Sequence, residues 1–350
     1  MSERIYLIDG RKNSYKANLH CHTNVSDGEL SPLAVKESYK EKGYSVVAYT
    51  DHEILVPHDD LNDENFIALS GYELIIYADK HLPLNMRRVT HINIISKTPD
   101  FVEQPVVNME NITRLEKHLD FSNWKKQDDS GDDFEYSAEN LNKIIKKVKD
   151  AGFIVSYNHP TWSKEDESYF TNIDGLYAME IYNHECQCIG YDAYCPYIYE
   201  AMLRSGQRLG CVATDDTHSK STVGGGFTMI QADNLEYGEI IAALENGDYY
   251  ASRGPEIKAL WYEDGVFHIE CSPAQRIVVS NSGRRSPATS RINSEGVTHA
   301  EFPIDEQDLF VRFTVYDKAG NTANTRAYFR DEFEKTPAAI PDICNRRIGG

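Results

Sequence analysis

The sequence predicts an α/β barrel followed by a small all-β domain, and two observations support this fold class. From about residue 15 to residue 253, short apolar runs typical of buried strands alternate with segments of helical periodicity. After Gly254 and Pro255 the chain continues in short strand patterns separated by turn signals, with no helical period. Alternation of the first kind is typical of a mostly parallel sheet with helices outside it.

The alternating region begins with a strand, a helix and a second strand. Between the two strands Ser31 caps a helix whose first position is Pro32, and Gly43 ends this helix. The buried strands predicted for the whole region are YKANLH (15–20), YSVVAYT (44–50), NFIALSG (65–71), THINIIS (90–96), FIVSYNH (153–159), LYAMEIYN (176–183) and RLGCVAT (208–214).

Two further helices are predicted from the spacing of apolar residues. Residues 137–152 carry four apolar side chains at helical spacing between Ser137 and Gly152, and residues 235–246 follow Asn234 as a possible cap. About seven strand candidates within ~240 residues suit a (β/α) barrel. An open doubly wound sheet is the alternative, but no Gly-rich dinucleotide loop follows the first strand.

Residues 256–331 are predicted to form a small all-β domain, most simply a sandwich. The first hairpin of this region turns at Asp264 and Gly265, a pair that favours tight turns between strands. We therefore divide the chain into a barrel of residues 1–255, a β sandwich of residues 256–331 and a loosely held tail of residues 332–350.

Composition and charge narrow the function classes. The chain of 350 residues is 41% hydrophobic and 26% charged, which is typical of a soluble globular protein. Its net charge of −19 opposes binding to long nucleic acids, because that affinity depends on Lys and Arg contacts to phosphates. No apolar run is long enough to cross a bilayer, and the first residues lack an apolar signal core, so we expect a cytoplasmic protein without membrane contact.

The seven cysteines are expected to be reduced and mostly buried. Their number is odd and they show no framework spacing, which favours a reducing compartment. Cys186 and Cys188 form a C-x-C pair, but no second pair lies nearby to complete a zinc knuckle. We interpret both as packing residues.

Six of the twelve histidines lie near the ends of predicted strands. His20 and His22 are two residues apart and therefore point to the same face of the first strand. Residues at the carboxyl ends of barrel strands converge on one mouth. His91 is the exception, because it begins its predicted strand. The candidates for one cluster are His20, His22, Asp27, His52, Glu73, His91, His159, Asp216 and His218.

Such a cluster predicts a metal centre. Six imidazoles and three carboxylates buried together need compensation, and divalent metals provide it. Mixed nitrogen and oxygen ligation suits Zn, Mn or Fe, and disfavours Mg and Ca, which prefer oxygen ligands throughout. Nine ligands are too many for one tetrahedral ion, so we expect two or three ions that share a carboxylate.

At this point the motifs resemble those of a known family, the PHP (polymerase and histidinol phosphatase) domain. The motifs, in order, are H-x-H-T-x-x-S-D-G (20–28), T-D-H (50–52), G-Y-E (71–73), the later His91, N-H-P (158–160) and D-D-T-H (215–218). The resemblance covers about residues 15 to 253. It implies a distorted (β/α)7 TIM-like barrel and a metal-dependent phosphoesterase with a trinuclear metal centre.

Carried over residue by residue, the resemblance implies three metal sites. Some relatives have a histidine where this chain has Asp27, which leaves the identity of the second metal open. The implied ligands are His20, His22, Glu73 and Asp216 for the first ion, Asp27, His52 and His218 for the second, and Glu73, His91 and His159 for the third, with Glu73 as the bridge.

The predicted activity is hydrolysis of a small phosphomonoester or nucleotide, which would be the small phosphorylated partner of this chain. Closely spaced metals neutralise phosphate oxygens and lower the pKa of a bound water toward neutrality. The hypothesis is in-line attack on phosphorus by a metal-bridging hydroxide, without a covalent enzyme intermediate. The sequence makes no prediction of the physiological substrate or the oligomeric state.

Four further residues are candidates for catalytic roles. Asp51 and Asp215 precede predicted ligands and are expected to orient imidazoles or waters, although either could be an ordinary surface carboxylate or helix cap. Arg253 follows the last barrel helix and could contact a phosphate, or serve only as a linker residue. His184 follows a strand and could line the pocket, or simply be exposed.

Other functions stay open on the sequence. An amidohydrolase barrel also begins with H-x-H, but it usually adds a lysine at the end of a middle strand, which this chain lacks. Exonuclease or polymerase proofreading is opposed by the acidic charge and by the lack of a polymerase region. A binding protein is the third alternative, with the β domain recognising a carbohydrate or protein. An exposed aromatic patch on 256–331 would favour binding, and an apolar face buried against the barrel would favour a structural role.

Overall fold

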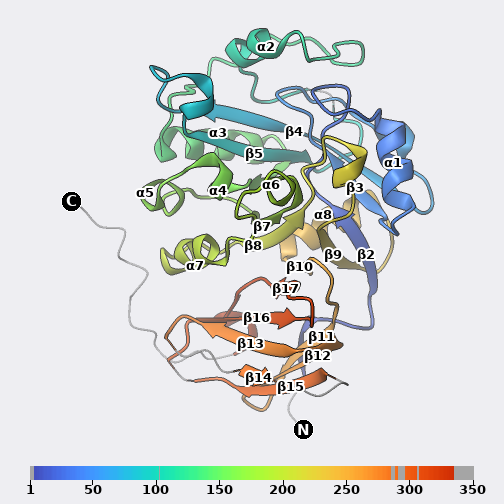
Figure 1. The fold of residues 1–350 in the computed structure, drawn as a ribbon, viewed down its shortest axis with the longest axis vertical. Helices are drawn as coiled ribbons and strands as arrows, with labels where there is room; N and C mark the ends of the chain where they lie inside the picture. Colours follow the sequence, from blue (N-terminus) through green and yellow to red (C-terminus); the bar gives the residue numbers. More distant parts are fainter. Residues whose placement is uncertain (1–3, 102, 285–287, 291–295, 306, 335–350) are drawn as a thin grey trace.

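The computed structural model of the chain describes residues 4–101, 103–284, 288–290, 296–305 and 307–334. It contains a mixed α/β part with its helices at the periphery, and a strand-rich part stacked against one end of it (Figure 1). The first part corresponds to the predicted barrel and the second to the predicted β domain.

The α/β part is built on one curved, mixed sheet. Its pairings are parallel between β2 and β3, β3 and β4, β6 and β7, and β7 and β8, and antiparallel elsewhere. The sheet order is β10-β9-β2-β3-β4-β5-β6-β7-β8. The strands are β2 (Asn13–Asn18), β3 (Val46–Tyr49), β4 (Ile67–Tyr77), β5 (Val89–Ser96), β6 (Phe153–Tyr157), β7 (Ala178–Asn183), β8 (Gly210–Thr214), β9 (Phe227–Ala232) and β10 (Tyr249–Ser252).

The predicted closed barrel is only partly present. Within the described residues, no backbone ladder joins β8 to β9, so the curved sheet stays open at this seam. The hydroxyl of Thr228 on β9 accepts from the amide of Ala213 on β8 (3.2 Å) and donates to the carbonyl of the same residue (3.1 Å). Because one side chain occupies both backbone groups of Ala213, the two strands touch without pairing there.

Two of the three predicted helices begin at their predicted caps, Ser31 and Ser137. Ser31 accepts from the amide of Ala34 (3.3 Å), and Ser137 accepts from the amide of Asn140 (3.1 Å). None of the described helices has the length and apolar character needed to cross a membrane. They are α1 (Pro32–Lys40), α2 (Met109–Leu115), α3 (Ala138–Asp150), α4 (Pro160–Ser163), α5 (Glu167–Phe170), α6 (His184–Cys188), α7 (Pro196–Arg204), α8 (Tyr237–Asn246) and α9 (Arg330–Phe333), with short 3-10 turns η1 (Asp59–Leu61), η2 (Leu84–Met86) and η3 (Lys220–Thr222).

One helix start was predicted too early. α8 begins at Tyr237 with Glu236 at the cap position, instead of following Asn234 directly. The amide and side-chain nitrogens of Asn234 instead donate to the carboxylate of Glu239 in the first turn of the helix (2.7 and 2.9 Å). The local hydrogen bonds therefore place Asn234 before the helix.

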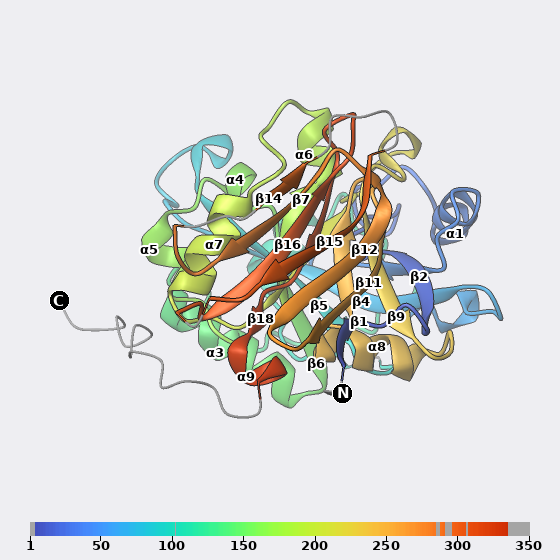
Figure 2. The same cartoon turned by 90° about the horizontal axis from the view of Figure 1, so that it is seen from below.

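The strand-rich part consists of two sheets around an apolar core. One sheet has the order β1-β11-β12-β15, and the other strands extend the large sheet through the pairing of β17 with β10. Seen from below in Figure 2, these strands lie in front of the α/β part, whose helices are mostly visible around them. The strands are β1 (Ile5–Ile8), β11 (Ile257–Glu263), β12 (Val266–Ala274), β13 (Arg276–Asn281), β14 (Ala288–Ser290), β15 (Val297–Pro303), β16 (Phe310–Tyr316), β17 (Thr322–Thr325) and β18 (Tyr328–Phe329).

The predicted division at residue 255 does not separate the two parts completely. β1 lies at the start of the chain, yet it pairs with β11 in the strand-rich part. β10 carries the large sheet across the boundary into β17. Pairing over such sequence separations leaves no local pattern, which explains why the sequence did not indicate it. Residues 332–334 of the predicted tail end α9 and its flank, and residues 335–350 lie outside the described part.

The seam between the two parts is apolar and tightly held. Tyr199, Cys211 and Ala327 are buried in the core of the α/β part at this end. The guanidinium of Arg312 lies 2.5 Å from the carboxylate of Glu200 across the seam. In the described residues of 256–334, no large hydrophobic side chain is exposed. A structural role for the β region predicts a buried contact of this kind with the α/β part.

Candidate metal centre

The H-x-H segment lies directly after β2 and is held on both sides. The amide of His22 donates to the carbonyl of Thr217 (2.9 Å), and the amide of Thr50 donates to that of Cys21 (2.9 Å). His20 and His22 are both buried, and their Nε2 atoms are 3.1 Å apart. Cys21 instead packs in a separate apolar cluster with Val35 and Tyr39, as the alternation of a strand requires.

Glu73, from the middle of β4, lies at the centre of the cluster. Both of its oxygens are surrounded by imidazole nitrogens, and the side chain is 1% exposed. The distances are 3.2 Å from Oε1 to His20 Nε2, 3.1 Å from Oε1 to His91 Nδ1, 3.3 Å from Oε1 to His159 Nε2, 3.0 Å from Oε2 to His52 Nδ1 and 3.5 Å from Oε2 to His22 Nε2.

Asp216, after β8, is a second centre of convergence. Its Oδ1 lies 3.2 Å from His20 Nε2 and 3.1 Å from His22 Nε2. All nine predicted ligands fall into four overlapping groups whose ligand atoms lie within 4.8 Å of one another. These groups are His22, Asp27, His52 and His218; His20, His22 and Glu73; His20, His159 and Asp216; and Glu73, His91 and His159.

The grouping follows the predicted one with two differences. The group of Glu73, His91 and His159 is as predicted for the third ion, whereas His22 also joins the group predicted for the second. His159 lies within reach of Asp216, with 3.8 Å between Nε2 and Oδ2. The assignment of each ligand to one particular ion therefore stays a prediction.

Asp27 reaches the cluster through a tight turn. Its carboxylate lies 3.4 Å from His52 Nε2 and 3.5 Å from His218 Nε2, and it is 40% exposed. A Cβ at Gly28 would meet the carbonyl oxygen of His22 at 2.5 Å, so only glycine allows the chain to fold back this closely. The S-D-G motif thus has a steric reason.

The residues of the cluster fit divalent metal ions. Five buried side-chain atoms lie close to opposite partners but lack hydrogen-bonding geometry, and burial without a partner is costly. Lone pairs that point at a common cation instead of at one another give this pattern. The five atoms are His22 Nδ1, His52 Nδ1, Glu73 Oε2, His91 Nδ1 and Asp216 Oδ1.

The pKa shifts of two candidate ligands suit ligation, whereas the nearby carboxylates raise the pKa of His20, His52 and His159, which a metal ion would have to deprotonate. Burial, together with the neighbouring His52 and His218, lowers the pKa of His22 to about 4, so this imidazole is neutral at pH 7. Burial alone would raise the pKa of Glu73, but the surrounding imidazoles of His91 and His20 hold it well below its usual range. A neutral imidazole and an ionised carboxylate are the forms that bind metals.

Two of the candidate ligands occupy unusual backbone conformations. His159 has φ of 24° and Asp216 has φ of 53°, both in the left-handed region. The amide of Asp216 donates to the carbonyl of His20 (3.0 Å), and the amide of His159 donates to the carboxylate of Glu180 (2.9 Å). Such conformations concentrate at functional sites, where surrounding contacts hold them.

Asp51 and Asp215 hold loops, whereas the sequence predicted that they orient imidazoles or waters. Asp51 accepts from the amide and hydroxyl of Thr23 (2.8 and 2.9 Å) and from the hydroxyl of Ser26 (2.7 Å). Asp215 accepts from Tyr39 (2.9 Å) and from the three amides of Gly224, Gly225 and Gly226 (2.5, 2.9 and 2.8 Å). Each carboxylate therefore fixes backbone beside the cluster.

Arg253 and His184 lie outside the four groups. The guanidinium of Arg253 stacks over the ring of Tyr182 at 4.8 Å and donates to the carbonyl of Gly320 (3.2 Å). The Nδ1 of His184 lies 2.8 Å from the hydroxyl of Tyr182, and its ring packs on Gly225. The structure thus joins these two residues through Tyr182, and a phosphate contact stays a prediction.

The sequence analysis missed Glu180, which supports the cluster from β7. Its Oε1 lies 2.7 Å from His20 Nδ1, and its Oε2 accepts from the side chain of Asn183 (2.9 Å). Asn183 also donates to Asp216 Oδ2 (3.1 Å), so it links two carboxylates. A glutamate inside the apolar run LYAMEIYN was the available signal, because a buried charge in a strand needs a partner.

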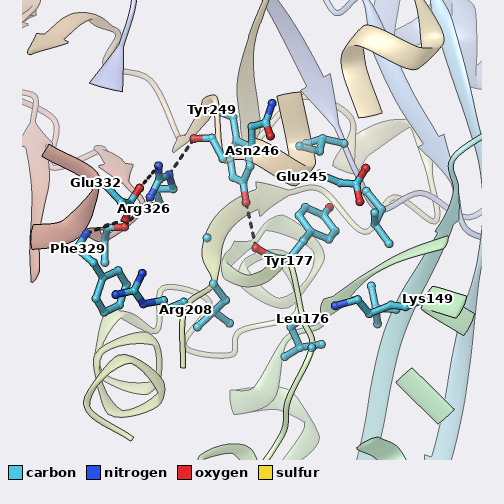
Figure 3. Close-up of a pocket in the computed structure, with 18 residues that line it drawn as sticks. Lys149, Leu176, Tyr177, Arg208, Glu245, Asn246, Tyr249, Arg326, Phe329 and Glu332 are labelled. Atoms are coloured by element: carbon cyan, nitrogen blue, oxygen red, sulfur yellow. Dashed lines mark hydrogen bonds and ion pairs between the residues drawn. The ribbon is translucent and has the colours of Figure 1, made fainter. Parts of the chain in front are cut away.

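Two cavities differ in their relation to the cluster. A cavity of about 180 Å³ opens beside Asp27 and His52 and is bounded by His118. A larger cavity of about 350 Å³ lies at the seam, where Tyr249 donates to the backbone oxygen of Tyr177 (3.3 Å; Figure 3). The larger cavity contains none of the nine candidate ligands.

Comparison with known proteins gives only distant structural likeness. No family model matches the sequence, and no curated protein matches it. A two-domain protein from Bacteroides vulgatus that contains a predicted PHP-like metal-dependent phosphoesterase is similar over 89% of this chain and 92% of its own, with 15% identity and a TM-score of 0.44.

Two further solved structures show weaker likeness. An amidohydrolase from Chromobacterium violaceum is similar over 58% of this chain and 87% of its own, with 14% identity and a TM-score of 0.35. The lesion-specific endonuclease PfuEndoQ from Pyrococcus furiosus is similar over 67% of this chain and 56% of its own, with 15% identity and a TM-score of 0.37. Likeness at this level assigns no activity to the chain.

Proposed function

We propose that this chain is a metal-dependent phosphoesterase of the PHP type. It hydrolyses a small phosphomonoester or nucleotide at a site for three divalent ions, with Zn, Mn or Fe as the candidates. The observation that carries the proposal is the convergence of nine ligand side chains, Glu73 among them, in overlapping groups, with five buried atoms that lack hydrogen bonds. When bound, such ions neutralise phosphate oxygens and acidify a coordinated water.

The exposure of the ligands supports one open side for the substrate. The side chains of Asp27 and His218 are 40% and 29% exposed, whereas that of His20 is 0% exposed. Asp27 and His218 therefore border the entrance, and the buried ligands hold the interior. The cavity of about 180 Å³ beside Asp27 suits a small ester group, and the imidazole of His118 bounds it. His118 is thereby placed to contact the leaving group.

The proposal is tested by metal content and phosphate release. The purified chain is assayed for bound Zn, Mn and Fe, and then for phosphate release from nucleotides and sugar phosphates with added Mn or Zn. His20→Ala and Asp216→Ala are expected to lose both metal and activity, while His81→Ala, a change at an exposed histidine, keeps both. Full activity in His20→Ala would overturn the site, and no metal and no phosphate release would favour the binding alternative.

The same screen separates the amidohydrolase alternative. Amide and lactone substrates are included beside the phosphate esters, under identical metal conditions. Phosphate release without amide hydrolysis is the expected result. The reverse result would leave the metal centre in place but overturn the substrate class.

A further inference from the structure

A second set of metal-ligating side chains lies on the outer face of the four-stranded sheet. His268 on β12 is directly opposite Glu301 on β15, and His299 is two residues from Glu301 along the same strand. Cross-strand neighbours and i, i+2 residues share one face of a sheet. Each of the three offers a ligand atom within 4.8 Å of the other two. None of them belongs to the metal centre.

The spacing of these atoms suits an ion better than hydrogen bonds. His268 Nδ1 lies 3.4 Å from Glu301 Oε1, and His299 Nε2 lies 4.0 Å from the same oxygen. Hydrogen bonds between nitrogen and oxygen are shorter, about 2.7–3.2 Å. Ligands of a tetrahedral zinc ion, at bonds of about 2.0–2.1 Å, lie about 3.3 Å apart. A small rotation of the exposed His299 closes the remaining gap.

The ring of His268 is held in a defined orientation. It stacks on Trp261, its cross-strand neighbour on β11, with 4.9 Å between ring centroids and an interplanar angle of 2°. The guanidinium of Arg4 lies 5.3 Å from the same indole and is paired with Glu263 (2.8 Å). The imidazole therefore does not have to give up free rotation when it binds an ion.

The charge at this position favours a cation. Among the described residues, the ion-pair partners of Glu301 are His268 and His299, both of which are neutral when they act as ligands. The Glu301 side chain is 59% exposed and His299 is 45% exposed, so an ion can enter from solvent. Two imidazoles and one carboxylate suit Zn²⁺, Ni²⁺ or Cu²⁺ and disfavour Mg²⁺ and Ca²⁺.

We propose that His268, His299 and Glu301 form a second metal site, which binds one borderline divalent transition ion with water in the open position. This site is separate from the proposed phosphoesterase centre and does not depend on it. The ion would link β12 to β15, and β15 is an edge strand of the four-stranded sheet. Binding to the folded state alone stabilises that state by mass action.

Two tryptophans allow the two sites to be observed separately. Trp261 stacks on His268, whereas Trp162 lies 5.4 Å from the ring of His91 and 5.1 Å from that of His159. A paramagnetic ion such as Ni²⁺ quenches an indole close to it. The Trp162→Phe chain, stripped with a chelator, keeps Trp261 and a third tryptophan, Trp124. It reports Ni²⁺ at the surface site through the part of the quench that a further Trp261→Phe change removes.

The titration has a defined outcome. In Trp162→Phe, Ni²⁺ is expected to quench emission saturably, and added His299→Ala is expected to weaken the apparent affinity at least tenfold. Trp261→Phe in the same background removes the quench, and His81→Ala leaves it unchanged. A quench that needs more than about 1 mM Ni²⁺, or that His299→Ala does not alter, would overturn the proposal.

Metal counting gives a second measurement. Wild-type chain loaded with Zn²⁺ is expected to hold one ion more than His299→Ala or Glu301→Gln, with phosphate release equal in all three. Both changes are at exposed positions, so misfolding does not obscure the result. An equal metal count in the three proteins would contradict the site.

Discussion

The two ends of the α/β part, the seam and the mouth that holds the candidate ligands, differ in how their buried charged groups are partnered. At the seam, Arg312 is paired with Glu200 at 2.5 Å, and Arg326 is paired with Glu332 at 2.7 Å. At the mouth, five buried nitrogen and oxygen atoms lack hydrogen-bond partners. Burying a charge is costly unless it is paired. At the seam, Arg312 Nε and Tyr177 Oη also lack a hydrogen-bond partner within the described residues, but neither belongs to a group of ligand atoms. At the mouth the five atoms lie together in such groups, which a bound cation would satisfy.

The comparison also shows which feature identifies a functional site. The cavity at the seam, about 350 Å³, is larger than that beside Asp27, about 180 Å³. Around the seam cavity, however, Arg208 already contacts both oxygens of Asp331 (2.9 and 2.8 Å), and Figure 3 shows Arg326 beside Glu332. Unmet ligand atoms are therefore a better guide here than volume.

The largest effect is expected at the mouth. Asp216→Asn keeps the shape of the side chain but removes the charge that lies 3.2 Å from His20 and 3.1 Å from His22. Phosphate release is expected to fall more than about 100-fold, beyond the range for outer ligand partners. The bound metal falls with it, as measured by elemental analysis. If Asp216→Asn kept its full metal content, the proposed difference between the mouth and the seam would be wrong.

A smaller loss of activity is expected for Glu180, which contacts the candidate ligand His20. Glu180→Gln removes a charge from the partner of His20 Nδ1 without removing its hydrogen-bonding capacity. Activity or metal affinity is expected to fall about 10- to 100-fold. Steady-state kinetics at several metal concentrations distinguish a fall in activity from a fall in metal affinity. Unchanged kinetics would mean that Glu180 is only a structural neighbour.

At the seam, the expected effect is on stability alone. Arg312→Met removes one of the two cations paired with Glu200, because Arg204 stays 3.6 Å away, and the Glu200 side chain is 30% exposed and can be hydrated. We expect a loss of about 2 kcal/mol in the free energy of unfolding, below the ~3–5 kcal/mol for a fully buried pair. Urea denaturation measures this change. A drop in phosphate release by the folded variant would contradict the assignment of the seam as structural.

The last effect depends on pH and concerns Glu165, a half-buried carboxyl for which the described residues provide no ion pair. Burial raises the pKa of Glu165 to about 7, although the hydroxyls of Thr90 and Tyr157 favour its charged form. The folded-state pKa of Glu165 lies above its unfolded value. The contribution of this group to the free energy of unfolding is therefore fully present below about pH 4.5 and is lost as the pH rises through 7. Glu165→Gln is expected to remove this dependence.

The expected difference between the two proteins is ~2–3 kcal/mol, or about 3–4 °C in Tm, at pH 8 relative to pH 5. Thermal unfolding at both pH values measures it, with the exposed Glu139→Gln as the matched control. Parallel pH profiles for wild type and Glu165→Gln would show that Glu165 keeps an ordinary pKa in the fold.

The metal centre was more predictable than the fold around it. Most of its ligands follow strand ends, although Glu73 and His91 lie inside β4 and β5. The two-residue period of a strand places His20 and His22 on one face from local sequence alone. Glu180 could be recognised as a buried charge in need of a partner, but local sequence does not identify that partner as His20, 160 residues away. Asp51 and Asp215 were found, but their role depends on loop backbones that no pattern specifies.

The fold was predictable as far as its signals are local. Caps such as Ser31 and Ser137 mark helix starts through neighbouring amides. Closure of the sheet is not a local property, because it depends on the contact between Thr228 on β9 and Ala213 on β8. The site formed by His268, His299 and Glu301 escaped for the same reason, since the register of β12 and β15 brings it together.

The pairing of β1 with β11 has a consequence for biosynthesis. Ile8 lies opposite Leu260, so β1 has no partner strand until about 250 further residues have been synthesised. At ~5–20 residues per second on the ribosome, this delay is about 10–50 s. The apolar strand Ile5–Ile8 is meanwhile an unpaired edge. A chain truncated at residue 255 would lack β11, and β1 would then stay without this partner.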